Sequence, residues 1–359
     1  MPLAKYVFKP GINKEGTNYS NEGGWFDADK VRFRKGRPER IGGWQKQSTN
    51  SFIGTGRKIY TYKSSDGSNY ITLGTHQKLY VLEGSEYADI TPIRATTTNG
   101  ITFAATNGST TITATDSNHG AVQGDFVTIS EAVSLGGNIT ASVLNQEYQI
   151  DSVPSVNTFT FTATATANSS DTGNGGSAAD AVYQLNSGLD SYVQSTGWGA
   201  GTWSSGTWGS STSLSFSNQL RLWSIDNFGD DAVFNPRAGG IFFWDESSGT
   251  STRAVNVTSL AGASDVPTIA LQVMVSDVDK HAIVFGCNPI GSSTLDPLLV
   301  RFSDKESITD WTPTAINQAG GVQLSMGSSI IGALQTRQEI LIWTDVGIVS
   351  MRFVGAPFV

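Results

Sequence analysis

Glycine and tryptophan alternate through the stretch Gly197–Asp245, and this stretch restricts the fold more than any other. It opens GWGAGTWSSGTWG, where the rings are Trp198, Trp203 and Trp208. Two short apolar runs follow, Gln219–Ile225 and Gly240–Asp245, each with one tryptophan. Glycine permits tight turns beside bulky rings because it adopts positive φ without steric cost. The pattern therefore predicts short strands joined by tight turns.

Composition points to the same fold class. Among 359 residues, 40 are Gly and only 15% are charged, and long helical periodicity is lacking, which favours an all-β chain with many turns. The single cysteine, Cys287, cannot form an intrachain disulfide or a CxxC site. The N-terminus lacks the apolar region of a signal peptide. No apolar run reaches the ~20 residues of a membrane-spanning helix, so we expect no membrane span.

Charge divides the chain into a basic leader and an acidic remainder. Residues 1–50 contain ten Lys and Arg against five Asp and Glu, whereas the remainder contains thirteen against twenty-six. No Lys or Arg occurs from Ala95 to Leu220. Two segments of opposite charge are expected to meet different partners.

The basic residues of the leader cluster around one alternating run, Lys30–Arg34. Val31 and Phe33 alternate with cations, which predicts a strand with one basic and one apolar face. A nucleic-acid strip would need a broader basic surface with stacking aromatic rings. We favour a strand whose charged face meets an acidic neighbouring subunit or solvent, because the whole chain is acidic. The interface residues predicted here are Lys30, Arg32, Arg34, Lys35, Arg37 and Arg40.

Units of short strands, each the size of a propeller blade, are predicted before and after residues 95–180. The first comprises Lys58–Tyr62, Tyr70–Gly74, Lys78–Leu82 and Tyr87–Ile93, and four such strands in ~40 residues match a propeller blade. Three segments resemble further degenerate copies, at Asn218–Trp244, Lys280–Trp311 and Gln338–Phe353. We therefore expect a β-propeller-like body of short antiparallel blades.

Residues 95–180 do not follow this pattern of blade-sized units. They contain β-branched runs such as TTITAT, DFVTIS and TFTFTATA. They end in the flexible-looking NSSDTGNGGSAAD. We expect a small inserted β-barrel or sandwich whose two ends lie close together. The predicted domains are a basic leader or strand at 1–50, a first blade at 51–94, the inserted domain at 95–182, and continued blades at 183–359.

No motif identifies an enzyme. Carboxylates are plentiful, but no spacing selects a glycosidase pair. The sequence has no P-loop, GxSxG elbow or HExxH, and His76, His119 and His281 are far apart. In DNFGDD, Asp226, Asp230 and Asp231 suggest calcium, yet the spacing of a dedicated loop is missing and a solvated turn is favoured. The five tryptophans Trp198–Trp244 suit a β core better than a carbohydrate platform. We predict no catalytic residue, cofactor or metal.

Several long motifs resemble structural tail proteins of short-tailed bacteriophages, the tail nozzle or tail hub family. They are PGINKEGTNYSNEGGWFDADKVRFRKGRPERIGGW, GWGAGTWSSGTWG, LRLWSIDNFGDDAVFNPRAGGIFFWD, LLVRFSDKESITDWTPT and TRQEILIWTDVGIVSMRFVGAPFV. The insertion, with GDFVTI and NQEYQIDSVPSVNTFTFTATA, resembles a small β module named after the first catalytic cysteine half-domain of ubiquitin-activating enzymes. This module does not imply ubiquitin chemistry.

The resemblance implies a non-enzymatic virion protein, assembled in the host cytoplasm and located in the phage tail. Its subunits would form a homohexameric ring below the portal and adaptor rings and conduct DNA during ejection. Each subunit would bind further copies of itself, tail adaptor or head–tail connector proteins, and tail fibre or tailspike proteins. Genomic DNA would pass through the ring without specific binding. An acidic lumen would repel DNA phosphates. The alternative is a carbohydrate-binding or depolymerase protein at the tail tip. Related chains continue past this point, so we expect either a last blade that another segment or chain completes, or a sequence that is a fragment. Otherwise a hydrophobic edge such as ILIWTD would be free and would favour aggregation.

Overall fold

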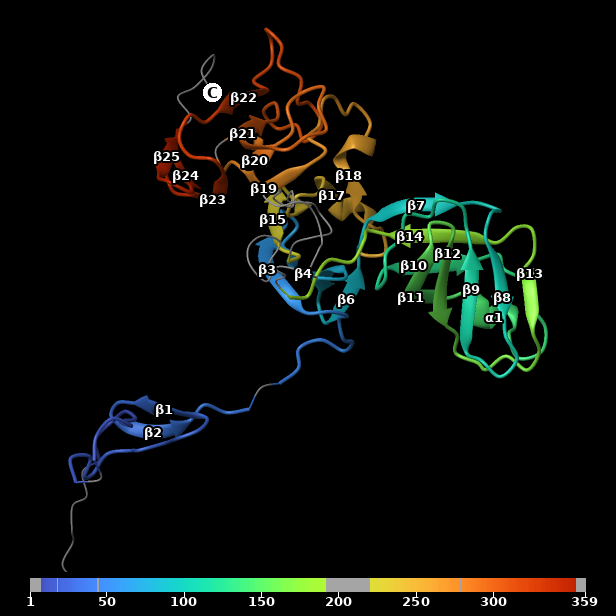
Figure 1. Ribbon diagram of the computed structural model, residues 1–359. Helices are drawn as coiled ribbons and strands as arrows, with labels where there is room; N and C mark the ends of the chain where they lie inside the picture. Colours follow the sequence, from blue (N-terminus) through green and yellow to red (C-terminus); the bar gives the residue numbers. More distant parts are fainter. Residues whose placement is uncertain (1–7, 18, 44, 192–219, 278, 353–359) are drawn as a thin grey trace, which may run out of the picture. The chain divides into compact units, whose positions relative to one another are not determined.

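The computed structural model describes residues 8–17, 19–43, 45–191, 220–277 and 279–352. The chain splits into two compact units, Met1–Thr49 and Asn50–Val359, called here the arm and the body. Nearly all regular structure is antiparallel β, as Figure 1 shows, with one short α-helix and two 3-10 turns in the described ranges. The predicted all-β class is confirmed.

The arm contains one hairpin, formed by β1 (Val31–Arg34) and β2 (Arg37–Arg40). Its two-residue turn is Lys35–Gly36, with φ of 50° and 77°, the positive values that a type I′ turn requires. Phe33 on β1 lies against Trp25, with ring centroids 6.3 Å apart. This contact fixes the apolar face of the hairpin, so the basic side chains of β1 point the other way.

The body contains four sheets in which each strand pairs with the next along the chain. Their strands are β3 (Gly56–Lys63), β4 (Asn69–Thr75), β5 (Leu79–Glu83) and β6 (Glu86–Asp89); β15 (Trp223–Phe228), β16 (Asp231–Pro236), β17 (Phe242–Trp244) and β18 (Val255–Asn256); β19 (Ala270–Val275), β20 (Ala282–Cys287), β21 (Asp296–Phe302) and β22 (Gly320–Gln323); and β23 (Ile330–Gln335), β24 (Ile340–Thr344) and β25 (Ile348–Met351). The 3-10 turns η1 (Glu246–Ser248) and η2 (Val257–Ser259) flank β18. This strand order is that of propeller blades.

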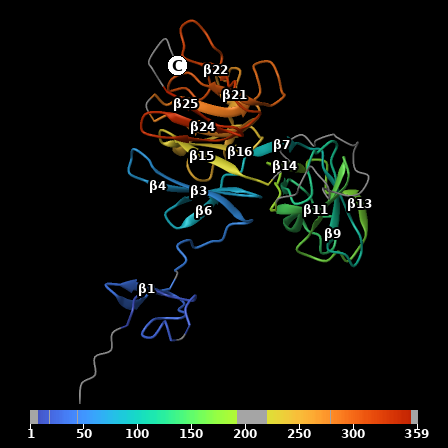
Figure 2. The same ribbon diagram turned by 60° about the vertical axis from the view of Figure 1, so that its left-hand side comes forward.

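Successive sheets stack face to face, with a separate apolar core between each pair, and their strands can be followed in Figure 2. Trp223 and Trp244 lie in the core between the first and second sheets. Trp311 lies between the second and third, and Phe285 lies in the core between the third and fourth. Because bulky aromatic side chains fill each interface, hydrophobic burial holds the stack together.

Some strands differ from the predicted copies. The strand β16 lies between the two predicted runs Gln219–Ile225 and Gly240–Asp245 and was not predicted separately. The third sheet runs from Ala270 to Gln323 and is longer than the predicted copy Lys280–Trp311. The run ILIWT forms β24, which pairs on both sides, and β25 is the outer strand.

The inserted region forms one eight-stranded sheet around its own apolar core. Its strands are β7 (Ile93–Thr97), β8 (Thr102–Ala105), β9 (Thr111–Thr115), β10 (Phe126–Ser130), β11 (Glu147–Ser155), β12 (Thr158–Thr162), β13 (Asp171–Asn174) and β14 (Asp180–Gln184), with α1 (Ala141–Leu144) before β11. β7 and β14 pair, so the two ends of the insertion are adjacent.

Of the two expected forms, barrel or sandwich, the described strands do not form a closed barrel. The sheet order is linear and ends at β13 and β7, which do not pair with each other. The predicted flexible segment NSSDTGNGGSAAD contains the edge strand β13, which pairs with β8. Its side chains are mostly exposed, which explains why an apolar pattern did not reveal it.

Candidate functional site

The six predicted interface cations all lie on or beside the hairpin of the arm, but the structure divides them. Arg34 and Arg37 are register partners next to the turn residue Lys35, so three cations gather at one end. This cationic tip consists of Arg34, Lys35 and Arg37. Arg32 instead forms an ion pair with Glu39 at 3.2 Å. Lys30 lies 4.0 Å from Asp29, and Arg40 is paired with Val31 at the other end of the hairpin.

Within the arm, the cationic tip has no ion-pair partner among the described side chains. None of the described Asp and Glu residues of the arm pairs with Arg34, Lys35 or Arg37. Like charges directly opposite one another in a hairpin are destabilising. An anionic group at the tip would relieve this repulsion.

The described residues of the arm also form no buried core. Among its described residues, 8–17, 19–43 and 45–49, not one side chain is buried. Large apolar side chains are exposed instead, including Tyr19 at 95% and Phe26 at 57%. A folded unit of this size normally needs a core, a disulfide, a metal or a partner. Exposed aromatic rings beside arginines have the composition of a protein interface.

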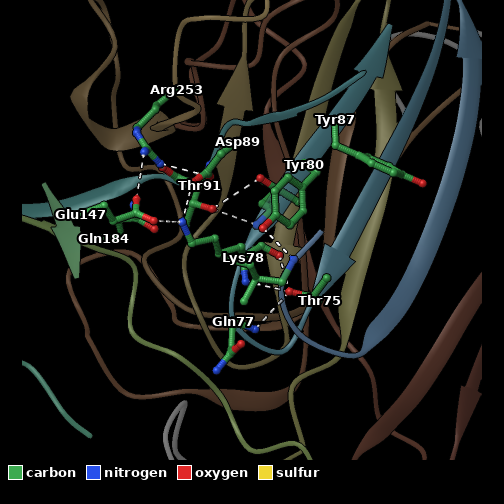
Figure 3. A network of polar contacts seen from close by, with 12 residues as sticks. Thr75, Gln77, Lys78, Tyr80, Tyr87, Asp89, Thr91, Glu147, Gln184 and Arg253 are labelled. Carbon is green, nitrogen blue, oxygen red and sulfur yellow. Dashed lines mark hydrogen bonds and ion pairs between the residues drawn. The ribbon is translucent and has the colours of Figure 1, made fainter. Parts of the chain in front are cut away.

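A second polar site joins the inserted sheet to the first two body sheets, and Figure 3 shows it from close by. Lys78, only 3% exposed, forms ion pairs with Glu147 and, at 2.8 Å, with Asp89. Arg253 contacts the same two carboxylates, at 3.1 Å from Asp89 and 3.8 Å from Glu147. Gln184 also donates a hydrogen bond to Glu147. Two cations and two carboxylates thus form a neutral cluster, the junction cluster.

Burial and charge act in opposite directions on Asp89 in the junction cluster. Burial disfavours the carboxylate, but the charges of Lys78 and Arg253 outweigh it and hold the pKa of Asp89 below its usual value. The ammonium of Lys78 also lies 4.3 Å from the ring centroid of Phe126. Sequence reasoning missed this cluster, because its members come from three distant segments, at residues 78–89, 147 and 253. The available signal was a single lysine at the start of the apolar run KLYVL.

Two cavities lie between body sheets. One of about 300 Å³ is lined by the first strands of all four sheets and includes Trp223, Asp226 and Arg237. The other, of about 340 Å³, lies between the third and fourth sheets and includes Phe302 and Glu339. Each cavity has one carboxylate in its lining, whereas glycoside hydrolysis needs a pair across the scissile bond.

The three carboxylates of DNFGDD diverge and bond to different elements. Asp226 accepts hydrogen bonds from the hydroxyl of Tyr60 and the N–H of Val275, and burial raises its pKa. Asp230 accepts from Ser65, and Asp231 accepts from the N–H of Glu246. In the described ranges, no three His, Cys, Asp or Glu side chains gather where they could hold a metal ion. Asp226 therefore connects strands of three sheets, whereas Asp230 and Asp231 hold a loop and a 3-10 turn in place.

The remaining candidates of the sequence analysis are separated in space or buried. Trp198, Trp203 and Trp208 lie outside the described residues. Trp223 and Trp244 are 7% and 1% exposed, and their indole N–H groups donate to the carbonyls of Thr75 and Thr252, so both are core residues. The three histidines lie in different sheets or loops: His76 near Asp190, His119 beside Tyr183 and His281 against Ser303.

Cys287 is fully buried, and burial raises the pKa of its thiol to about 12. Within the described part of the chain, no helix has the length and apolar character needed to cross a bilayer.

Comparison with known proteins yields distant similarity to solved structures only. No protein-family model matches the chain, and no curated protein matches it. Among solved structures, it is similar to the endosialidase of phage phi92, with 14% sequence identity and a TM-score of 0.23. The match covers 85% of this chain and 43% of that one, so this chain spans less than half of its length. At this TM-score the similarity supports no argument about function.

Proposed function

We propose that this protein is a structural subunit of a phage tail, a ring-forming nozzle or hub below the portal–adaptor complex that conducts DNA during ejection. The motifs that resemble the tail nozzle family, in the leader and the body, support the class. The observation that carries the proposal is the arm, a folded unit with exposed cations and aromatic rings in which none of the described residues is buried. Such a unit suits assembly into a larger particle.

The arm needs a covering surface to stay folded. A two-stranded hairpin is at best marginally stable in water, because it buries too little apolar area to offset the loss of chain entropy. A covering surface would supply that area and an anionic group for the cationic tip. An acidic neighbouring subunit or adaptor fits both needs, and electrostatic complementarity would set its orientation.

The charge of the body suits a DNA conduit. Residues 50–359 carry thirteen Lys and Arg against twenty-six Asp and Glu, so most of this surface repels phosphate. A duplex passing a repulsive wall does not form the cation contacts that retain DNA on binding proteins. The proposal therefore predicts weak, nonspecific DNA binding by the assembled particle.

The test is the mass of the particle by light scattering, for the full chain alone and with its adaptor ring. We expect a six-fold ring, alone or on the adaptor. The double variant Arg34→Glu with Arg37→Glu should weaken assembly at least tenfold, and the effect should shrink at high salt. The control is Lys58→Glu with Lys280→Glu, two exposed cations of the body and the same change in charge.

A chain that remains a monomer with and without the adaptor would overturn the proposal. Loss of DNA binding, with assembly intact, would show instead that the cationic tip is a nucleic-acid strip. The alternative function at the tail tip is tested with the same protein by binding and hydrolysis of host-surface glycans, and turnover there would replace the ring proposal.

A further inference from the structure

We propose that the cationic tip of the arm binds an acidic patch on the body of a neighbouring copy of this chain. The acidic patch lies at loop ends of the first and second body sheets and consists of Asp66, Asp230, Asp231, Asp245 and Glu246. This inference deepens the proposed function and rests on it, because it names the surface that an acidic neighbouring subunit would offer to the arm.

Hydrogen bonds between the loops bring the carboxylates of the acidic patch together. The N–H of Ser65, in the connection between β3 and β4, donates to Asp230 at 2.8 Å. The N–H of Glu246, which follows β17, donates to Asp231 at 3.0 Å. The two remaining carboxylates of the patch are the chain neighbours of Ser65 and Glu246. Three loops from two sheets therefore form one acidic surface.

The carboxylates of the acidic patch repel one another and have no cation to balance them. Among the described side chains, none of the five forms an ion pair. Burial, and then the charges of Asp245, Asp230 and Glu246, raise the pKa of Asp231. Hydrogen bonds from Ser65, and more weakly the charge of Lys280, hold the pKa of Asp230 below its usual value. A bound cation would relieve the repulsion.

A buried hydroxyl beside the acidic patch lacks a partner as well. Tyr62 is 8% exposed, and no described group forms a hydrogen bond with its hydroxyl. Its ring lies 5.5 Å from that of Tyr70, whose hydroxyl donates to Glu246 at 2.8 Å. A buried polar group without a partner costs free energy. Because a guanidinium has several N–H donors and no acceptor, it suits a surface of carboxylate oxygens with a phenol oxygen next to them.

The arm of a second copy has the chemistry that the acidic patch lacks. Two of the three cations of the tip are arginines, and none has an ion-pair partner among the described side chains of the arm. Charge complementarity of this kind steers association and fixes orientation. Residues 41–49, between the hairpin and the body, can extend over about 30 Å, which lets the arm reach a neighbouring copy.

The position of the two surfaces on one chain favours a ring. Every copy carries both a tip and an acidic patch, so the tip of one copy can bind the patch of the next without a further protein. The two surfaces differ, which makes the contact heterologous, and such contacts close into a ring when the rotation between copies allows it.

The first experiment exchanges the charges. The tip variant is Arg34→Glu with Arg37→Glu, and the patch variant is Asp66→Lys with Asp245→Lys. Each alone should raise the dissociation constant of the ring at least tenfold, since like charges would meet. An equal mixture of the two should form rings as the wild type does, because in an alternating ring every contact again joins opposite charges. Light scattering measures the mass in all three cases.

The outcomes separate this inference from the proposed function. If assembly returns only when both reversals are combined in one chain, the arm binds its own body and the inference is wrong. If the patch variant assembles normally while the tip variant does not, the tip binds another protein or another surface. That result overturns the inference and leaves the proposed function standing. A wild-type chain that forms no ring, alone or on the adaptor, overturns both.

Two further variants control for folding and for total charge. Asp66 and Asp245 accept hydrogen bonds from the N–H groups of Ser68 and Ser247, so circular dichroism checks that the patch variant is folded. Asp66→Asn with Asp245→Asn keeps an acceptor at both positions and should weaken assembly less than the lysine pair. The matched control reverses two exposed carboxylates of the inserted region, Glu131→Lys with Asp151→Lys, and should assemble as the wild type does. Equal loss in this control and in the patch variant would contradict a specific contact.

Discussion

At the scale of single residues, Lys78 is the charge whose removal should matter most. Its ammonium is buried between Asp89 and Glu147, which both accept its hydrogen bonds. Lys78→Met keeps the apolar stem but leaves two carboxylates with only Arg253. Removal of one partner of a buried ion pair costs about 3–5 kcal/mol, and since the carboxylates are 22% and 32% exposed we expect about 2–3 kcal/mol. Urea unfolding measures the loss.

The control for this prediction is Arg352→Met. Arg352 pairs with Glu339 at 3.6 Å, but its side chain is 60% exposed and that of Glu339 31%, so water already screens the charge. Its removal should leave the free energy of unfolding nearly unchanged. Equal losses in the two variants would show that burial does not strengthen the junction cluster.

The cations of the arm could be predicted from the sequence, whereas the junction cluster could not. The cations of the arm follow each other within a few positions, so strand alternation alone predicts which of them share a face. The junction cluster joins residues 78, 89, 147 and 253, and only the stacking of three sheets brings them together. Strand periodicity carries no information on such contacts.

At the scale of elements, local patterns predicted strands well where alternation and turn residues agree. The first body sheet has all four expected strands, because SSDGSN and THQ separate clear apolar runs. The strand β13 escaped prediction since its residues are mostly Gly, Asp and Asn. The sequence could not decide between a barrel and a sandwich for the insertion, because closure depends on whether two edge strands pair, which no single strand encodes.

Substitution of Gly74 on β4 tests how closely the first two sheets pack. A Cβ at this position would lie 2.5 Å from the ring of Trp223. That ring cannot easily move, because its N–H donates to the carbonyl of Thr75 at 2.7 Å. Gly74→Ala should therefore destabilise the body by about 1–3 kcal/mol through overpacking. Thermal unfolding followed by tryptophan fluorescence measures the change.

Gly332→Ala is the matched strand variant. The nearest atom to a Cβ there is the Oε1 of Gln272 at 3.6 Å, an ordinary contact, so no clash is expected. Alanine also reduces the entropy of the unfolded chain, and this variant should be neutral or slightly stabilising. If Gly74→Ala changes the stability no more than Gly332→Ala does, the interface between the first two sheets is looser than described.

At the scale of the whole molecule, the body contains two kinds of core that share no residue. The core of the inserted sheet is built entirely from residues 101–183, whereas the three cores of the stack use residues before and after it. The links between them are polar, chiefly the junction cluster. Two separate cores joined by ion pairs are expected to unfold as separate cooperative units.

Excision of the insertion tests this independence. β7 pairs with β14 through Ile93 and Gln184, so a short glycine linker in place of residues 95–182 should join two ends that are already adjacent. The shortened chain would lose Glu147, and Glu147→Gln in the full chain is the control for that loss. We expect calorimetry to show two transitions for the full chain and one for the shortened chain, with the sheet-stack transition at nearly the same temperature in the shortened chain and the control. Retention of ring assembly would place the contacts in the arm and the stack. A shortened chain that cannot fold would show instead that the inserted sheet is part of the body's cooperative core.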